Sequence, residues 1–139
     1  MKVILDTSFL IELKRGNKKA VEALEERKDE CEDIIVSMLT VYELLVGVNY
    51  VWKKYGNAKE MMIINDMLKS LTVVPVDLDV VKRASEVKSE LMLRGMDVPD
   101  LDVLIACSDE DAEILMFDKD FNPLRELGFK ITFLGDDDE

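Results

Sequence analysis

Residues 2–10, KVILDTSFL, predict a strand that runs directly into a helix. Lys2 to Leu5 are predicted to form a short buried strand that stops at an acid, Asp6. Thr7 and Ser8 then offer hydroxyls that cap a helix, and the apolar residues from Phe9 onward give that helix its buried side. A strand that leads directly into a helix predicts an α/β protein.

The same alternation of strand and helix continues along the chain. Further strands are predicted at residues 34–37, 72–76, 114–117 and 130–134. Helices are predicted over about 17–30, from about 39, from about 61 to 71, over 77–93, and from 99. Strands that are short, apolar throughout and separated by helices indicate a parallel sheet covered on both faces.

The length and composition fit one soluble domain. The chain has 139 residues and is 48% hydrophobic, enough for a single core without disulfides. We expect one domain over residues 1–135 and a solvated acidic tail at 136–139. No apolar run approaches the ~20 residues that a membrane span needs, and Asp6 comes too early for a signal peptide, so a cytoplasmic location is expected. Cys31 and Cys107 are predicted to be free thiols.

The types of residue in the chain limit the catalytic mechanisms that it could use. There is no histidine, which excludes Ser-His and Cys-His mechanisms and histidine-ligated zinc. Carboxylates are abundant, 30 Asp plus Glu against 18 Lys plus Arg, so an enzyme would rely on acids, alone or with a hard cation. The net charge of −12 argues against a passive nucleic-acid binder. An acidic nuclease remains coherent if divalent ions screen its site and local lysines guide the strand.

Several acids are placed where α/β sheets form their sites, at the carboxyl ends of strands. Asp6 and Asp118 directly follow strands, Glu43 is near the start of the helix after the second strand, and Asp102 is in the first turn of the helix predicted near residue 99. Asp120 could join them. Clustered carboxylates need a compensating cation, and divalent ions could activate a water and stabilise the leaving oxygen in phosphodiester cleavage.

Each of these acids also has a purely structural alternative. Asp6 could cap a helix, and Glu43 could be a solvated helix residue. Asp102 favours the positive end of a helix dipole. Asp118 and Asp120 could be turn or cap residues. Taken singly, none of the five identifies a site.

Two other groups are interpreted structurally. The acids within residues 109–113 are expected to form a solvated face rather than a metal site. Tyr50, Trp52 and Tyr55 lie on one predicted helix and could stack on nucleic-acid bases, but a core position or a subunit contact is favoured over that function.

Four segments, taken together, resemble the successive motifs of the PIN-domain family. They are VILDTSFLIEL (3–13), TVYELLVG (40–47), GMDVPDLDVLIA (95–106) and FDKDFNPLRELG (117–128). The likeness is strongest to VapC-type toxins and spans residue 2 to about residue 134. Each motif is short, but four in the family's order are specific.

The resemblance implies a three-layer α/β/α fold with a parallel sheet of about five strands, and Mg²⁺- or Mn²⁺-dependent cleavage of RNA. Asp6, Glu43, Asp102 and Asp118 correspond to the family's four metal-binding acids. Asp120 matches a position that is often acidic in relatives. The resemblance also implies a homodimer and a small antitoxin protein that blocks the acidic cleft.

The residues beside the first and fourth acids are informative as well. Thr7 and Ser8 match hydroxyls that orient the first acid or touch substrate. Phe117 departs from the family, which commonly has Thr or Ser there. Loss of that hydroxyl could weaken metal binding or slow turnover.

Three functions are therefore compared. The first is a metal-dependent endoribonuclease resembling a VapC toxin. The alternative is a non-catalytic PIN-like module that binds RNA or protein, which Phe117 and the net charge support. A phosphatase or phosphoacceptor protein built on Asp6 is disfavoured, because Ser8 breaks the DxDx[TV] pattern of one such group.

Overall fold

A five-stranded parallel sheet lies at the centre of the computed structural model, which describes residues 1–136. The order across the sheet is β3-β2-β1-β4-β5, and every neighbouring pair is parallel. The chain moves outward from β1 to β3 and then returns to the other side of β1, so the order reverses between β1 and β4. The strands are β1 (Lys2–Leu5), β2 (Asp33–Ser37), β3 (Thr72–Val74), β4 (Glu113–Met116) and β5 (Lys130–Phe133).

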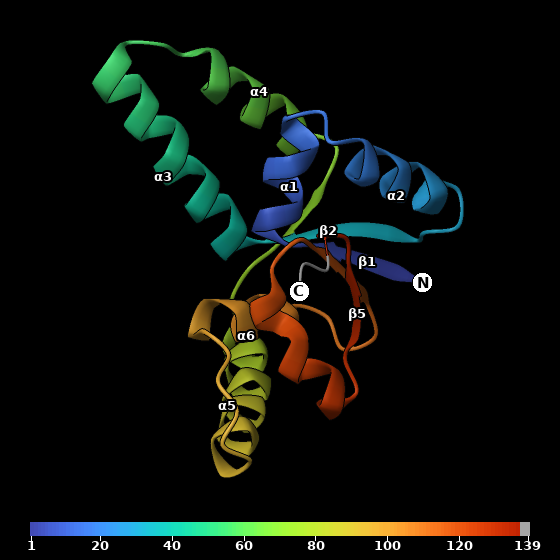
Figure 1. Cartoon of the computed structure of the whole chain (residues 1–139). Helices are drawn as coiled ribbons and strands as arrows, with labels where there is room; N and C mark the ends of the chain where they lie inside the picture. Colours follow the sequence, from blue (N-terminus) through green and yellow to red (C-terminus); the bar gives the residue numbers. More distant parts are fainter. Residues whose placement is uncertain (137–139) are drawn as a thin grey trace.

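Helices cover both faces of this sheet (Figure 1). One face carries α1 (Thr7–Lys14), α2 (Lys18–Lys28), α3 (Met38–Tyr55) and α4 (Lys59–Leu68). The other carries α5 (Leu78–Leu93), α6 (Asp100–Ala106) and the 3₁₀ helix η1 (Lys119–Leu127). The expected three-layer α/β/α arrangement with a parallel sheet is confirmed.

The two cores take alternate residues of the same strands. Val3 and Leu5 pack in the core beneath α1 to α4, whereas Ile4 packs in the core beneath α5, α6 and η1. All three side chains are buried. Because both faces of β1 are covered, every position after Lys2 is apolar, and this explains the continuous apolar run that the sequence shows.

The strand register aligns the carboxyl ends of the central strands. Val3 pairs with Ile34 of β2 and with Glu113 of β4, and the Asp6 N–H continues the ladder by donating to Leu115 O at 3.1 Å. The segments that leave β1, β2 and β4 therefore open onto one edge of the sheet. Asp6 lies at this edge, at the position where the strand order reverses.

The α3–α4 hairpin projects from the body of the molecule (Figure 1). Helix α3 has 18 residues, which at 1.5 Å per residue makes it about 27 Å long. Gly56 ends it with a left-handed backbone (φ 67°), and its N–H donates to Trp52 O at 2.8 Å. Asn57 Oδ1 then accepts from Lys59 N at 2.9 Å, and α4 returns toward the sheet.

Some boundaries differ from the sequence-based expectation. The third strand ends at Val74 rather than at residue 76, and the fourth is Glu113–Met116 rather than 114–117, so Phe117 lies just beyond it. Residues 119–127 form η1, which was not predicted. A 3₁₀ helix lacks the 3.6-residue period on which helix prediction depends, and Pro123 within it argues against a helix.

The predicted acidic tail lies almost wholly outside the described residues, since 137–139 are not among them. Asp136 is described, and its carboxylate pairs with Lys19 Nζ at 2.9 Å. Both cysteines are free, as predicted, and Cys107 is the C-cap residue of α6. Within residues 1–136, no helix has the length and apolar content that crossing a membrane requires.

Candidate active site

The predicted acids meet at the carboxyl edge of the sheet, above β1 and β4. Asp6 follows β1, and Asp118 lies two residues beyond the end of β4. Glu43 comes from the second turn of α3, Asp102 from the first turn of α6, and Asp120 from the start of η1. Five side chains from distant parts of the chain thus form one group, defined here as the acid cluster.

The acid cluster has a tight centre and two flanking members. One carboxylate oxygen from each of Asp102, Asp118 and Asp120 lies within 4.8 Å of the other two. Asp6 and Glu43 lie outside this trio, yet both are near enough for their charges to raise the pKa of Asp102. Asp120 was predicted to join the other four acids and to support the ions or the water, and it belongs to this centre.

Asp6 is the most buried member, with 3% of its surface exposed. Its Oδ2 caps α1 by accepting from Ser8 N at 3.0 Å and from Ser8 Oγ at 2.5 Å. Its Oδ1 is buried and has no hydrogen-bond partner within residues 1–136. The capping role and a site role are therefore compatible, because each uses a different oxygen, and a buried oxygen without a partner is the kind of group that a bound cation satisfies.

Burial, with a smaller effect of the neighbouring acids, raises the pKa of two members of the cluster. Burial raises the pKa of Asp6 to about 6, against the opposing effect of the Ser8 hydrogen bonds. Burial also raises the pKa of Asp102 to about 7, and the charges of the other four acids add to this. An all-oxygen, strongly negative donor set fits a hard divalent cation such as Mg²⁺ or Mn²⁺.

Asp118 resembles Asp6 in capping a helix while facing the cluster. Its Oδ1 accepts from Asp120 N at 2.9 Å and so begins η1. This bond sets Asp118 and Asp120 side by side at the start of one short helix. The cap interpretation of Asp118 is confirmed, and it is also what brings these two carboxylates together.

A hydroxyl network positions Glu43. Thr7 Oγ1 donates to Glu43 Oε1 at 2.6 Å and is hydrogen-bonded to Thr40 Oγ1 at 3.0 Å. Glu43 is half-buried, so its alternative as a freely solvated helix residue is wrong. The fully buried Thr40 was missed from the sequence. Its spacing of three residues from Glu43 places both on one helix face and could have indicated it.

Ser8 connects the first acid to the end of β4. Its Oγ donates to Asp6 Oδ2 and accepts from the backbone N–H of Phe117 at 2.9 Å. The Phe117 ring lies beside Phe9, with ring centroids 6.1 Å apart. Phe117 therefore supplies no side-chain hydroxyl to the site. Its backbone N–H instead donates to the Ser8 hydroxyl, which in turn donates to Asp6.

Removal of the Ser8 hydroxyl tests this connection. If Asp6 holds a metal ion, as predicted, Ser8→Ala is expected to weaken Mn²⁺ binding about tenfold or more, because the hydrogen bond that supports the Asp6 carboxylate is lost. Titration calorimetry of the metal-free protein measures the affinity. Ser85→Ala, which removes an exposed hydroxyl bonded to Lys82 O on α5, is the matched control. Equal affinity of Ser8→Ala and Ser85→Ala would show that Ser8 does not support the acid cluster.

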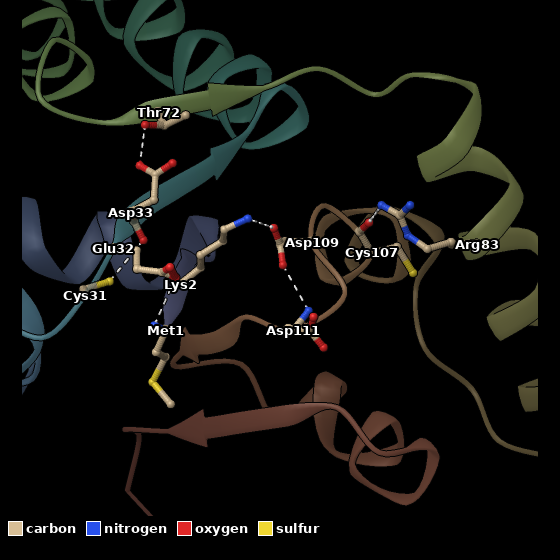
Figure 2. A network of polar contacts seen from close by, with 10 residues as sticks. All are labelled: Met1, Lys2, Cys31, Glu32, Asp33, Thr72, Arg83, Cys107, Asp109 and Asp111. Atoms are coloured by element: carbon tan, nitrogen blue, oxygen red, sulfur yellow. Dashed lines mark hydrogen bonds and ion pairs between the residues drawn. The ribbon is translucent and has the colours of Figure 1, made fainter.

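The opposite, amino edge of the sheet also holds acids, and two of them, Glu32 and Asp109, form ion pairs (Figure 2). A hollow of about 440 Å³ opens there. Asp109 beside it pairs with Lys2 at 3.2 Å and accepts from Asp111 N at 3.0 Å, and Glu32 pairs with the Met1 ammonium at 3.3 Å. These acids form no candidate metal site.

One residue of the 109–113 segment was interpreted wrongly as part of a solvated face. Glu113 is half-buried and accepts from Arg27 Nε and Nη2 at 2.7 and 2.9 Å and from Thr132 Oγ1 at 2.5 Å. These bonds hold the pKa of Glu113 below its ordinary value. Glu113 therefore joins α2 to β4 and β5.

The fold and site together define a class: a doubly covered parallel α/β domain whose carboxylates gather where the strand order reverses. The model of the PIN domain matches residues 3–127, and the chain belongs to the PIN-domain family. The resemblance seen in the sequence motifs is confirmed.

Similar proteins include a VapC and structures of VapBC complexes. The chain is 26% identical to Ribonuclease VapC1 of Methanocaldococcus jannaschii over 133 residues, which cover 94% of this chain and 86% of that protein. It superimposes with a TM-score of 0.81 and 19% identity on a chain in the structure of VapBC2 from Rickettsia felis bound to a promoter DNA fragment, covering 96% and 98% of the two chains. For DNA-bound VapBC from Salmonella typhimurium the TM-score is 0.78, with the same identity and coverage. These structures share its fold.

Proposed function

We propose that this protein is a metal-dependent endoribonuclease of the VapC type, which cleaves RNA phosphodiester bonds with a metal-activated water at the acid cluster. The observation that carries the proposal is the trio of Asp102, Asp118 and Asp120 oxygens beside the buried, unpartnered Oδ1 of Asp6. PIN-domain membership and the likeness to Ribonuclease VapC1 support RNA as the substrate.

Each acid has a proposed role. Asp6, Glu43, Asp102 and Asp118 would hold the ion, and Asp120 would support the ion or the attacking water. When bound, Mg²⁺ or Mn²⁺ would lower the pKa of a water and neutralise charge on the phosphodiester.

The hydroxyls beside these acids would position them. Thr7 holds Glu43 and Ser8 holds Asp6, so these two residues would orient carboxylates rather than contact the RNA. Two roles were expected for these hydroxyls, orienting the first acid or touching substrate, and their hydrogen bonds to Asp6 and Glu43 support an acid-orienting role.

A groove next to the acid cluster supports an antitoxin partner. It has a volume of about 380 Å³ and lies between α1, α3 and α4, with Leu44, Val48 and Ile64 among its apolar lining and Glu43 at its border. A structural neighbour is a member of the VapBC family of toxin-antitoxin systems. A small antitoxin that places an apolar helix in this groove would lie against Glu43 and close the site.

An exposed apolar stripe supports a homodimer. Met38, Tyr42 and Val46 are spaced by four residues along α3 and are each about half exposed or more. Such spacing places them on one side of the helix, away from the sheet. We propose that a second copy of the chain covers this stripe.

Cleavage of RNA with and without metal tests the proposed activity. The protein is expected to cleave RNA with Mn²⁺, to lose cleavage in EDTA, and to lose about 100-fold or more when Asp6→Asn removes one carboxylate charge. Asp111→Asn at the opposite edge is the control and should retain activity. Cleavage unaffected by EDTA and by Asp6→Asn would refute the carboxylate mechanism, and specific RNA binding without any cleavage would favour the alternative, a non-catalytic PIN-like module.

A further inference from the structure

The tip of the α3–α4 hairpin differs in charge from the rest of the chain. Residues 44–59 contain three lysines and no acid, in a chain with 30 acids and a net charge of −12. Lys53, Lys54 and Lys59 are exposed, and no ion pair found within residues 1–136 involves any of them. The tip is therefore a local positive surface on an acidic molecule.

Three aromatic side chains share this tip. Tyr50, Trp52 and Tyr55 are 56%, 47% and 66% exposed. The core position considered for them from the sequence is therefore wrong. Lys54 Nζ lies 5.5 Å from the Tyr50 ring centre and 5.4 Å from that of Tyr55, and it donates to Tyr50 Oη at 3.0 Å. The charged Lys54 ammonium thus lies close to both tyrosine rings.

We propose that this tip, defined by Tyr50, Trp52, Lys53, Lys54 and Tyr55, binds single-stranded RNA that flanks the cleavage point. The inference rests on the proposed nuclease function for the identity of the strand. Lysines attract the phosphates, and exposed rings stack on bases of any sequence, which is the combination that single-strand binding uses.

The distance to the acid cluster suits this function. Glu43 and Lys54 lie on the same helix, eleven residues apart, which corresponds to about 16 Å along its axis. At the stacked rise of about 3.4 Å per nucleotide, a segment of about five nucleotides spans that distance. A strand held at the tip is therefore long enough to reach the site where it would be cut.

The chain offers a direct spectroscopic probe, because Trp52 is its only tryptophan. An unlabelled oligouridylate of about 12 nucleotides is long enough to reach from the tip to the acid cluster. Added to the full-length protein in EDTA, which prevents metal-dependent cleavage, it is expected to quench the Trp52 emission, and high salt should reverse the quenching. Binding of the oligonucleotide with unchanged Trp52 emission would overturn the proposal.

Two pairs of lysine substitutions distinguish the effect of the tip on RNA binding from the effect of the net charge of the protein. Lys53→Gln with Lys54→Gln is expected to weaken oligouridylate binding about tenfold and to reduce the slope of log affinity against log salt by about 1.4, at 0.7 per phosphate contact. Lys28→Gln with Lys82→Gln changes the net charge equally at exposed sites on α2 and α5 and should have less than about a twofold effect. Tyr55→Ala should weaken binding about tenfold, as measured by the affinity of the variant for a labelled oligouridylate.

Other results would refute RNA binding at the tip, or would separate it from the proposed nuclease activity. If both lysine pairs have equal effects, the tip is not the binding surface. If the tip variants leave RNA affinity unchanged but convert a dimer to monomers in sedimentation, a second copy of the chain covers the tip and the proposal is wrong. Because binding is measured without metal, tip binding in a protein that never cleaves RNA would sustain this inference while refuting the nuclease proposal.

Discussion

Asp102→Asn is expected to reduce metal-dependent RNA cleavage about 1,000-fold, equal to ~4 kcal/mol of transition-state stabilisation at 1.36 kcal/mol per tenfold. Asp102 shares the centre of the acid cluster with Asp118 and Asp120, and the other four acids all act on its pKa. The variant removes a carboxylate from that centre while keeping its size. Single-turnover cleavage of a labelled RNA with saturating enzyme measures the effect on the chemical step.

Asp100 provides a matched control within the same helical turn. Both acids lie in the first turn of α6, but the Asp100 side chain is 82% exposed and pairs with Lys88 at 3.2 Å. Asp100→Asn changes the net charge and the helix dipole interaction just as Asp102→Asn does. It should retain cleavage within about twofold, since an exposed ion pair contributes little. Equal losses in the two variants would show that Asp102 has no special role.

The metal-free protein is expected to lose stability as the pH rises from about 4 to 7. Asp6 and Asp102 have folded-state pKa values of about 6 and about 7, above the ordinary value of 3.8. Between these limits the folded chain binds more protons than the unfolded chain, so stability falls as pH increases. For the buried Asp6 alone, the pKa displacement corresponds to about 3 kcal/mol.

Divalent metal should reverse this loss. At pH 8 the ionised acids repel one another, and a bound cation compensates for them, so Mn²⁺ is expected to raise the melting temperature more at pH 8 than at pH 5. Glu113 has little effect on the comparison of pH 5 with pH 8, because its folded-state pKa lies below the ordinary value of 4.5 and its contribution to stability changes mainly below about pH 5. Thermal unfolding in EDTA and in Mn²⁺ at both pH values measures these differences. A flat or rising stability of the metal-free protein from pH 5 to 8 would show that the pKa values of Asp6 and Asp102 are not raised by folding.

Most of the fold could be predicted from local sequence patterns. The continuous apolar runs predicted strands buried on both faces, and the two core faces of β1 explain why those runs do not alternate with polar residues. The element that escaped prediction was η1, because its short 3₁₀ turns around Pro123 have neither a helical nor a strand period. Strand ends also shifted by a residue or two, since they depend on pairing across the sheet rather than on local composition.

The positions of the acids could be predicted, but which of them lie closest together, and which residues support them, could not. Strand ends and helix starts were enough to place Asp6, Glu43, Asp102 and Asp118 at one edge. That Asp120 belongs to the close trio depends on the cap that Asp118 makes to its backbone. That Thr40 supports Thr7 depends on how α3 packs against α1. Contacts of this kind are set by tertiary packing, which no local pattern records.

An anomalous difference map from crystals of the protein soaked in Mn²⁺ tests whether these acids share a bound cation. We expect a peak within coordination distance of the Asp6, Asp102 and Asp118 carboxylates, with Asp6 contributing the Oδ1 that has no hydrogen-bond partner among residues 1–136. The peak should disappear in Asp102→Asn and persist in Asp100→Asn. The absence of a peak at the acid cluster, at a Mn²⁺ concentration that supports RNA cleavage in solution, would show that these acids do not hold the ion on which cleavage depends.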